Sequence, residues 1–468
     1  MEITDFIYRN SPIYVQNMIC SAYGHFEKRK RFSKEFFTYL DWLEESQYWG
    51  SDKIYEYKLK ELQKIYQHAY SSVPFYRNRF KAAGLNANAI KDIEDFAKVP
   101  ILEKEDVRNN WKDLVSLNNA RERLFHRNTS GSSGKALDFY VTKRSTSLQW
   151  AVWWRFRKNF EVDFGDKSLN FIGKKVVPIN QSRPPFWRVN SPMNQHLVNM
   201  QHMKAENIKY FVDYINREQF VFFSGYPSII YSFCNLVENL GLIISNPPRI
   251  VFAGAEKVLE YQKMCIERVL GCMVTDHYGF SEGAGNASRC KHGIYHEDFE
   301  LGHLEPRNPK KISQTSFSGE ILATGFTNYG MPFIRYNVGD NATWGSEKCT
   351  CGRHSAILLN IEGRNEDHVI TPENTSIVRF GFLFRNTKNI EECQVVQYKL
   401  GEVTFRIVKR DTFSIKDEVS LKEKVREWIS PTILVNFEYV DEIERTDSGK
   451  FKAVVSYLNG EENNLNSF

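Results

Sequence analysis

The chain has 468 residues, of which 42% are hydrophobic and 25% charged, so it is long enough for two or three globular domains. Its net charge of +5 is small for this length, and no long basic block is present, so we expect no nucleic-acid partner. Its eight cysteines are too dilute for a disulfide framework. We find no signal peptide and no apolar run of about 18 residues, which predicts a cytoplasmic protein without membrane insertion.

The first part of the chain, to about residue 125, is predicted to be mostly helical. Residues 54–70 and 74–80 carry polar and aromatic side chains at helical spacing. From Leu137 onward, short β-rich runs alternate with longer amphipathic stretches, which is typical of a layered α/β domain. The runs are residues 137–142, 169–172, 220–223, 250–253 and 272–274, and the later ones are apolar enough for central strands covered on both faces.

A third pattern begins after about residue 316. Residues 319–324 and 332–336 are predicted to form antiparallel, barrel-like strands. The dipeptide Gly363-Arg364 interrupts this region, and a small α+β unit of about 100 residues follows. Within it we expect a strand at 402–408, a helix at 420–429 and a strand at 434–438. The predicted fold is therefore α/β, with a large N-terminal domain over residues 1–362 and a small α+β C-terminal domain over 363–468.

A run of Thr, Ser and Gly residues lies beside the first β-rich segment. Glycines let such a loop turn closely, and its N–H and hydroxyl groups can donate to phosphate oxygens. The run lacks the G-x-x-x-x-G-K-[ST] spacing of a Walker A loop, and taken alone it fits a solvent-exposed loop equally well. Its members are Thr129, Ser130, Gly131, Ser132, Ser133, Gly134 and Lys135.

Several further motifs follow this loop in a fixed order. In that order they resemble the adenylate-forming superfamily (acyl-CoA synthetases, luciferases and peptide-synthetase adenylation domains). In detail they are most similar to the phenylacetate–CoA ligase branch, including its relatives in capsular polysaccharide gene clusters. The resemblance extends from about residue 74 to about residue 454, and its motifs are residues 129–135, 225–228, 253–256, 277–282, 319–324, 327–340, 363–364 and 445–450.

The resemblance implies a two-step ligase whose small C-terminal domain is a mobile lid. A carboxylic acid is activated by ATP as an acyl-adenylate with release of pyrophosphate, and the acyl group passes to an acceptor, by default coenzyme A. One alternative is an amide-forming ligase that attaches an acid or amino acid to a sugar in surface polysaccharide biosynthesis. Another is a non-catalytic nucleotide-binding or zinc-stabilised interaction protein. A homodimer is left open.

The resemblance also assigns roles to residues that lie far apart in the sequence. The catalytic groups would be Thr129, Glu282 and Lys450, of which Glu282 would hold Mg²⁺ with ATP and Lys450 would lie on the lid. Glu366 would be the hinge. Each assignment has a plain rival, such as a surface glutamate in a turn for Glu282 or a solvated lysine for Lys450. The other nucleotide contacts would be Ser130, Gly131, Ser132, Ser133, Gly134 and Lys135 for phosphate, Gly254, Ala255, Glu256, Tyr278 and Gly279 for adenine, and Asp340 and Arg364 for ribose.

The substrate pocket is assigned by the same resemblance. Its candidates are aromatic or small residues that could equally be ordinary core: Phe139, Tyr140, Tyr226, Ala253 and Phe280.

Cysteine and histidine residues at two places predict a metal site. Cys349 and Cys351 flank one residue, and Cys290 lies six residues before His296. Three thiolates and one imidazole make a closed tetrahedral zinc set, which would be structural. His292 is the alternative fourth ligand, and reduced cysteines in loops are the alternative to a metal site. Relatives in the branch named above carry a similar arrangement.

Overall fold

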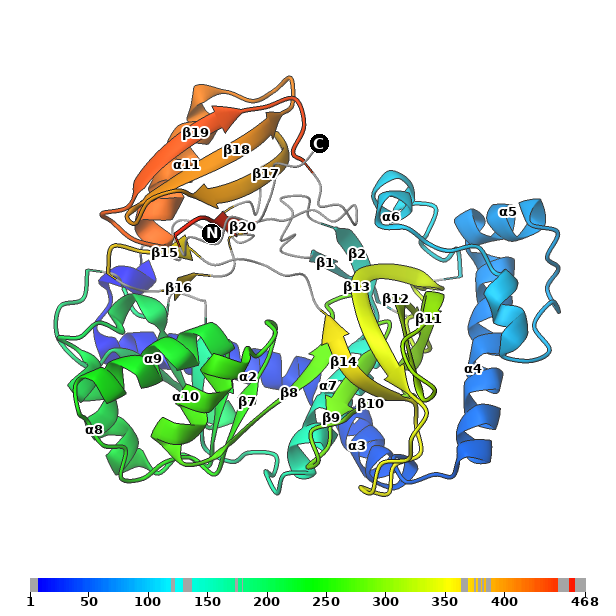
Figure 1. Ribbon diagram of the computed structural model, residues 1–468, viewed down its shortest axis with the longest axis horizontal. Coiled ribbons are helices and arrows are strands. Elements are labelled where there is room, and N and C mark those ends of the chain that lie inside the picture. The colour runs from blue at the N-terminus through cyan, green and yellow to red at the C-terminus, as the bar shows by residue number, and fades with distance from the viewer. Residues whose placement is uncertain are drawn as a thin grey trace.

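The computed structural model describes residues 7–118, 123–128, 137–172, 176–178, 180–362, 369–373, 376–377, 380, 383, 389–444 and 454–458. The predicted phosphate loop at residues 129–135, Arg364, Glu366 and Lys450 lie outside these described residues. A twelve-stranded sheet and a separate four-stranded sheet organise the chain, together with two two-stranded sheets. The four-stranded sheet lies above the larger part in Figure 1. The α/β fold class is confirmed.

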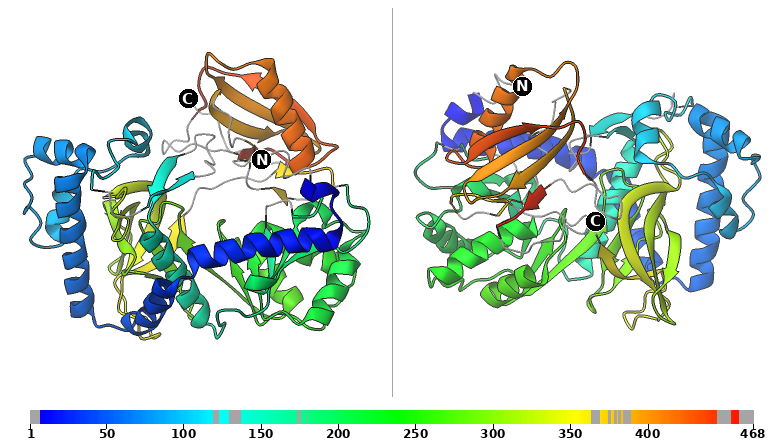
Figure 2. Two further views of the ribbon diagram at one scale, coloured as in Figure 1. Left: turned by 180° about the vertical axis from the view of Figure 1, so that it is seen from behind. Right: turned by 45° about the horizontal axis from the view of Figure 1, so that its top comes forward.

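Helices dominate the first part of the chain, as predicted. They are α2 (Ile13–Arg31), α3 (Lys34–Ser46), α4 (Ser51–Ser72), α5 (Pro74–Ala82), the 3₁₀ helix η1 (Glu94–Lys98) and α6 (Lys104–Asn110). The predicted helices at 54–70 and 74–80 lie within α4 and α5. Seen from behind, α2 runs across the outside of the molecule (Figure 2, left).

One half of the large sheet is mostly parallel. Its strands are β3 (Ser168–Ile172), β4 (Trp187–Asn190), β5 (Gln195–Asn199), β6 (Phe222–Gly225), β7 (Ile250–Ala253) and β8 (Met273–Gly279), with the 3₁₀ turns η3 (Ser191–Met193) and η4 (Met200–His202) around β5. The order β5-β3-β6-β7-β8 is parallel throughout, and β4 joins the edge antiparallel to β5. All of β7 is buried, as its apolar sequence predicted.

Helices cover both faces of this parallel half. On one face α8 (Ile208–Glu218), α9 (Pro227–Asn239) and α10 (Glu260–Leu270) share a core with Val251 and Ala253. On the other face α3 and α7 (Lys143–Lys158) share a core with Ile250 and Phe252. The alternation along β7 shows how a strand buries both sides between two helical layers.

The other half of the sheet is antiparallel and begins at β8, which pairs parallel with β7 and antiparallel with β9. The order continues β9-β10-β14-β13-β12-β11, and α4 and α5 pack on this half. A separate hairpin joins β1 (Phe125–Asn128) and β2 (Asp138–Val141). The remaining bounds are β9 (Asn286–Arg289), β10 (Tyr295–Glu297), β11 (Gly302–Lys311), β12 (Ser316–Gly325), β13 (Tyr336–Gly345) and β14 (Ile357–Glu362).

The predicted strand at 319–324 lies within β12, but the predicted strand at 332–336 is wrong except for its last residue. Pro332 has no N–H to give to a ladder. The Ile334 amide donates to the Tyr76 hydroxyl at 3.1 Å, and Arg335 has a positive φ of 48°. The segment therefore crosses as a loop, and β13 begins only at Tyr336.

The four-stranded sheet has the order β19-β18-β17-β20. Its strands are β17 (Ile390–Gln397), β18 (Glu402–Lys409), β19 (Leu434–Tyr439) and β20 (Val454–Ser456), with α11 (Ile415–Trp428) packed on them; β15 (Val369–Ile370) and β16 (Ser376–Ile377) form a small pair. The predicted helix at 420–429 begins too late, because Ser414 and Asp417 form a capping box that starts α11 at Ile415. The domain boundary at 362/363 stays a prediction, because residues 363–368 are not described. Among the described residues, no helix has the length and apolarity to cross a membrane.

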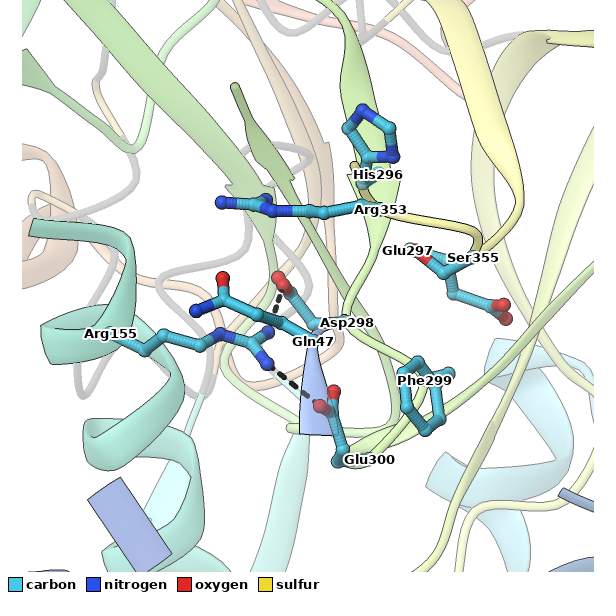
Figure 3. A pocket seen from close by; sticks show the side chains of 9 residues that line it. All are labelled: Gln47, Arg155, His296, Glu297, Asp298, Phe299, Glu300, Arg353 and Ser355. Atoms are coloured by element: carbon cyan, nitrogen blue, oxygen red, sulfur yellow. Dashed lines mark hydrogen bonds and ion pairs between the residues drawn. The ribbon is translucent and has the colours of Figure 1, made fainter. Parts of the chain in front are cut away.

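A turn rich in buried acids follows β10. Asp298 and Glu300 are 1% and 0% exposed, and both bind the guanidinium of Arg155 on α7, as Figure 3 shows. Glu297, beside them, accepts from Lys58 of α4 at 2.8 Å. Burial alone would raise the pKa of Glu297, but Lys58, His303 and the Leu304 amide lower it to about 2. The turn thus ties the sheet to two helices through paired charges.

Replacing Arg155 tests how much this turn depends on its cation. Arg155→Met leaves two buried carboxylates without their counter-charge, so we expect the free energy of unfolding to fall by about 3–5 kcal/mol. Arg268→Met is the matched control, because its pair with Glu238 is exposed and contributes at most about 1 kcal/mol. Urea denaturation of the three proteins measures both effects. Equal losses in the two variants would contradict this reading of the turn.

Candidate functional site

Two hydrogen bonds connect the β8 segment with β13, and each joins a tyrosine of one segment to an acid of the other. Tyr278 lies near the end of β8 and its hydroxyl donates to Asp340 Oδ2 at 2.9 Å. Tyr336 begins β13 and its hydroxyl donates to Glu282 Oε1 at 2.8 Å. Each segment therefore supplies a tyrosine and, four residues later, an acid, and each tyrosine holds the acid of the other segment. This reciprocal pair brings together three residues predicted to bind nucleotide or metal.

The phenols in these pairs are fixed as donors. Burial, followed by the neighbouring Asp340 carboxylate, raises the pKa of Tyr278 well above its usual range, so its hydroxyl keeps its proton. Tyr336 is fully buried, and Glu282 is 8% exposed. Tyr278 as a whole residue is half-buried. Each carboxylate is therefore held by a buried phenol that keeps its proton.

A local irregularity of β13 places Asp340. The register between β12 and β13 shifts between Glu320 and Leu322, whose partners are Asn341 and Asn337. The extra residues of β13 bulge out of the ladder there, which changes the direction of the Asp340 side chain. Gly339 has a φ of +83°, which favours glycine at this position.

The predicted adenine loop leaves β7 at the carboxyl end of the parallel strands. The Gly254 amide donates to the Gly225 carbonyl at 3.0 Å, and Glu256 accepts from the Ser228 amide at the start of α9 at 3.3 Å. Gly225 lets the end of β6 approach β3 closely, because a Cβ there would lie 2.2 Å from the Phe171 carbonyl oxygen. Ligands of open α/β sheets bind at such strand ends.

Gly279 and Phe280 continue from β8 toward Glu282. A Cβ on Gly279 would lie 2.4 Å from Asn286 Oδ1, so glycine lets β8 approach β9 closely. The Phe280 carbonyl accepts from Gln149 of α7 at 3.2 Å. These contacts fix the turn that carries Glu282.

The predicted substrate-pocket residues belong to different parts of the core. Phe139 is fully buried against Phe333, and Tyr140 packs near Trp111, both in the core of the antiparallel half. Tyr226 and Ala253 belong to the core of the parallel half. Phe280 packs beside Tyr278, with ring centroids 6.0 Å apart. The structure thus places Phe280 at the reciprocal pair and divides the other four between the two halves.

The four predicted metal ligands lie together. The ligand atoms of Cys290, His296, Cys349 and Cys351 are all within 4.8 Å of one another. Cys290 Sγ lies 3.7 Å from Cys349 Sγ, and Cys351 Sγ lies 3.3 Å from His296 Nε2. The alternative ligand His292 is not part of this group. The donor set and its spacing suit a four-coordinate zinc ion.

Comparison with known proteins gives relatives of similar length. A family model described as the CapK C-terminal domain matches residues 369–457. Protein CapK of Staphylococcus aureus is 25% identical over 97% of this chain and 99% of its own length. The phenylacetate–coenzyme A ligase of Thermus thermophilus is 22% identical over 86% of this chain and 96% of its own. The chain is therefore similar over most of its length to CapK and to a phenylacetate–CoA ligase.

The fold of this chain recurs in solved structures. A 2-hydroxyisobutyryl-CoA ligase in complex with its acyl-AMP and CoA has a TM-score of 0.59, at 18% identity, covering 88% of this chain and 91% of that one. The same ligase in a postadenylation state has a TM-score of 0.55 at 17% identity, covering 88% and 91% of the two chains. The sequence relatives confirm the resemblance inferred from the motifs, and the solved structures confirm the fold.

Some residues that orient these side chains were not identified from the sequence. Tyr336 stood inside a recognised motif without a role, although its position four residues before Asp340 repeats the Tyr278–Glu282 spacing. Asn286 of β9 donates to Asp298 and accepts from Trp153 of α7 at 3.1 Å, linking the acid turn to β9 and α7. No spacing rule signals such a contact, because its members come from three separate elements.

Proposed function

We propose that this protein activates a carboxylic acid with ATP as an acyl-adenylate and then transfers the acyl group to an acceptor, by default coenzyme A. The reciprocal pair carries the proposal, because it fixes Glu282 and Asp340 beside Tyr278 and near the carboxyl ends of the parallel strands. The relatives named phenylacetate–CoA ligase, and a fold shared with a ligase solved with acyl-AMP and CoA, support the same reaction.

In the first step a carboxylate oxygen of the acid attacks the α-phosphorus of ATP, and pyrophosphate leaves. Asp340 would accept the ribose hydroxyls, Tyr278 and the 254–256 loop would frame adenine, and Arg364 would also contact ribose. Residues 129–135 would donate to the phosphates and Lys450 would approach the reacting carboxylate and α-phosphate, because an anion that attacks a polyanion needs fixed donors and cations. Glu282 would hold Mg²⁺, which supplies charge neutralisation of the phosphates when bound.

In the second step the acceptor attacks the acyl carbonyl carbon, AMP leaves, and the acceptor loses its proton. A coenzyme A thiol gives a thioester and an amine gives an amide. Lys450 acts in the first step only, so the small domain would move between steps, with Glu366 as the hinge.

Pyrophosphate exchange tests this function directly. The wild-type protein is incubated with ATP, Mg²⁺, labelled pyrophosphate and a panel of aromatic, aliphatic and amino acids. We expect acid-dependent exchange with at least one class of acid. Coenzyme A and amines are then offered together as competing acceptors, and the product distinguishes thioester from amide. Absence of exchange with every acid would favour the non-catalytic alternatives.

Tyr336→Phe tests whether the buried phenol positions Glu282. Loss of a hydrogen bond to a carboxylate costs about 1.5–3 kcal/mol, so we expect exchange to slow about tenfold to a hundredfold. The Mg²⁺ concentration for half-maximal rate should also rise. Tyr76→Phe is the control, because this tyrosine is equally buried but donates to a neutral carbonyl, that of Pro332, at 2.9 Å. An unchanged Mg²⁺ requirement in Tyr336→Phe would refute the positioning role.

Lys450→Ala separates the two half-reactions. We expect pyrophosphate exchange to be lost, because the developing charge loses its cation, while acyl transfer from supplied acyl-adenylate stays close to wild type. Lys98→Ala, an exposed surface change, should affect neither reaction. Survival of both half-reactions in Lys450→Ala would show that the lysine is wrongly assigned.

We also propose that Cys290, His296, Cys349 and Cys351 bind one structural zinc ion. The support is the approach of their four ligand atoms to within 4.8 Å. Elemental analysis of purified protein should give about one zinc per chain. Cys349→Ser should lose it, whereas His292→Ala and Cys272→Ser, both outside the group, should keep it. Clearly substoichiometric zinc in the wild type would contradict the site.

A further inference from the structure

Helix α2 presents its large apolar side chains to solvent. Tyr14, Met18, Ile19, Tyr23 and Phe26 are 68%, 66%, 39%, 57% and 63% exposed. At 100° per residue these positions fall on one half of the helix, with the exposed Ala22 near the middle of that half and of the helix itself. We name these six residues the α2 face.

Polar contacts hold the opposite side of α2 against the protein. Gln16 accepts from Arg188 Nε at 2.7 Å, and Asn17 Oδ1 accepts from the Val189 amide of β4 at 3.0 Å. Gly24 leaves no room for a side chain, because a Cβ there would lie 1.8 Å from Asn190 Oδ1. Rotating the helix to bury the α2 face would break these contacts, so its outward direction is fixed.

Helix α2 thus exposes its apolar side and turns its polar side inward, whereas an ordinary surface helix buries its apolar stripe. The five large side chains expose on the order of 600 Å². That area is at the top of the range of about 300–600 Å² for the largest patch on a monomer, and it approaches the ~800 Å² that each partner gives to a stable interface. The α2 face contains tyrosine, phenylalanine and methionine and no acidic residue, which is typical of an interface core.

The charges around the α2 face favour a second copy of this chain over an anionic membrane. Of the basic run at residues 28–31, Lys28 donates to the Pro192 carbonyl at 2.7 Å, and Lys30 and Arg31 pair with Glu27. Arg29 is the one exposed member of the run. A single exposed cation is only weakly attracted to anionic lipid. The same cation can form a cation–π contact with an aromatic ring of a partner.

Antiparallel packing satisfies Arg29 symmetrically. Tyr14 and Arg29 lie at nearly equal distances along the chain from Ala22, so a two-fold axis near Ala22 sets Arg29 of each copy over the partner's Tyr14. A parallel pair would instead set the two arginines together. We propose that the α2 face is a self-association surface, through which two copies pair their α2 helices antiparallel about a two-fold axis near Ala22.

Sedimentation analysis of the full chain tests the self-association. The wild type should be a dimer at micromolar concentration, and Met18→Glu/Phe26→Glu should be a monomer that retains helix content. Ile243→Glu is the control, because this residue is 76% exposed outside the α2 face. It should remain a dimer. A monomeric wild type, a dimeric double variant, or equal dissociation by Ile243→Glu would overturn the proposal.

Oxidative cross-linking tests the orientation, with the wild type as the background for native cysteines. Ala22→Cys should form an intermolecular disulfide, and Arg29→Cys should not exceed the background. Efficient cross-linking of Arg29→Cys would overturn the antiparallel arrangement. The wild type is also sedimented with vesicles containing phosphatidylserine. Binding of monomers to these vesicles that is lost in Met18→Glu/Phe26→Glu would show that a membrane, and not a second copy, occupies the face.

Discussion

The hydrogen bonds Tyr278–Asp340 and Tyr336–Glu282 connect the β8 segment with β13, near the place where the parallel and antiparallel halves of the large sheet meet. Strand β8 has a parallel neighbour on one edge and an antiparallel neighbour on the other, and Glu282 lies in the turn that leads from β8 to β9. A tyrosine from each segment orients the acid of the other. The site therefore exists only when both halves of the sheet are correctly assembled.

The buried acids at residues 297–300 support this junction from the end of β9 and β10 that adjoins the end of β8. Arg155 and Lys58 neutralise them from two helices. Asn286 of β9, which faces Gly279 of β8, donates a hydrogen bond to Asp298. The predicted zinc ligands include His296, which directly precedes the turn. A metal ion there would hold the loop before β14 against β10. The ion pairs of the acid turn would then hold the end of β10 in place beside β9 and β8.

The sequence predicted much of the fold where local pattern and burial agree. Strand β7 was placed at its observed bounds because four apolar residues lie between turns, whereas the strand at 332–336 failed because Pro332 and Arg335 turn the backbone away from the ladder. Glu282 and Asp340 were found through motif order. Tyr336 was not, because a tyrosine in an apolar segment gives no sign of which carboxylate it will meet. The acidic turn was missed for a different reason, since three acids in four residues suggest solvent exposure.

The central claim is that the reciprocal pair marks the adenosine site of an acid-activating ligase. A crystal structure of the protein with AMP measures this most directly. The account predicts adenine between the 254–256 loop and the Tyr278 ring, with both ribose hydroxyls on Asp340 and the phosphate directed toward Glu282. Well-defined AMP density elsewhere, with Tyr278 and Asp340 uncontacted, would contradict it.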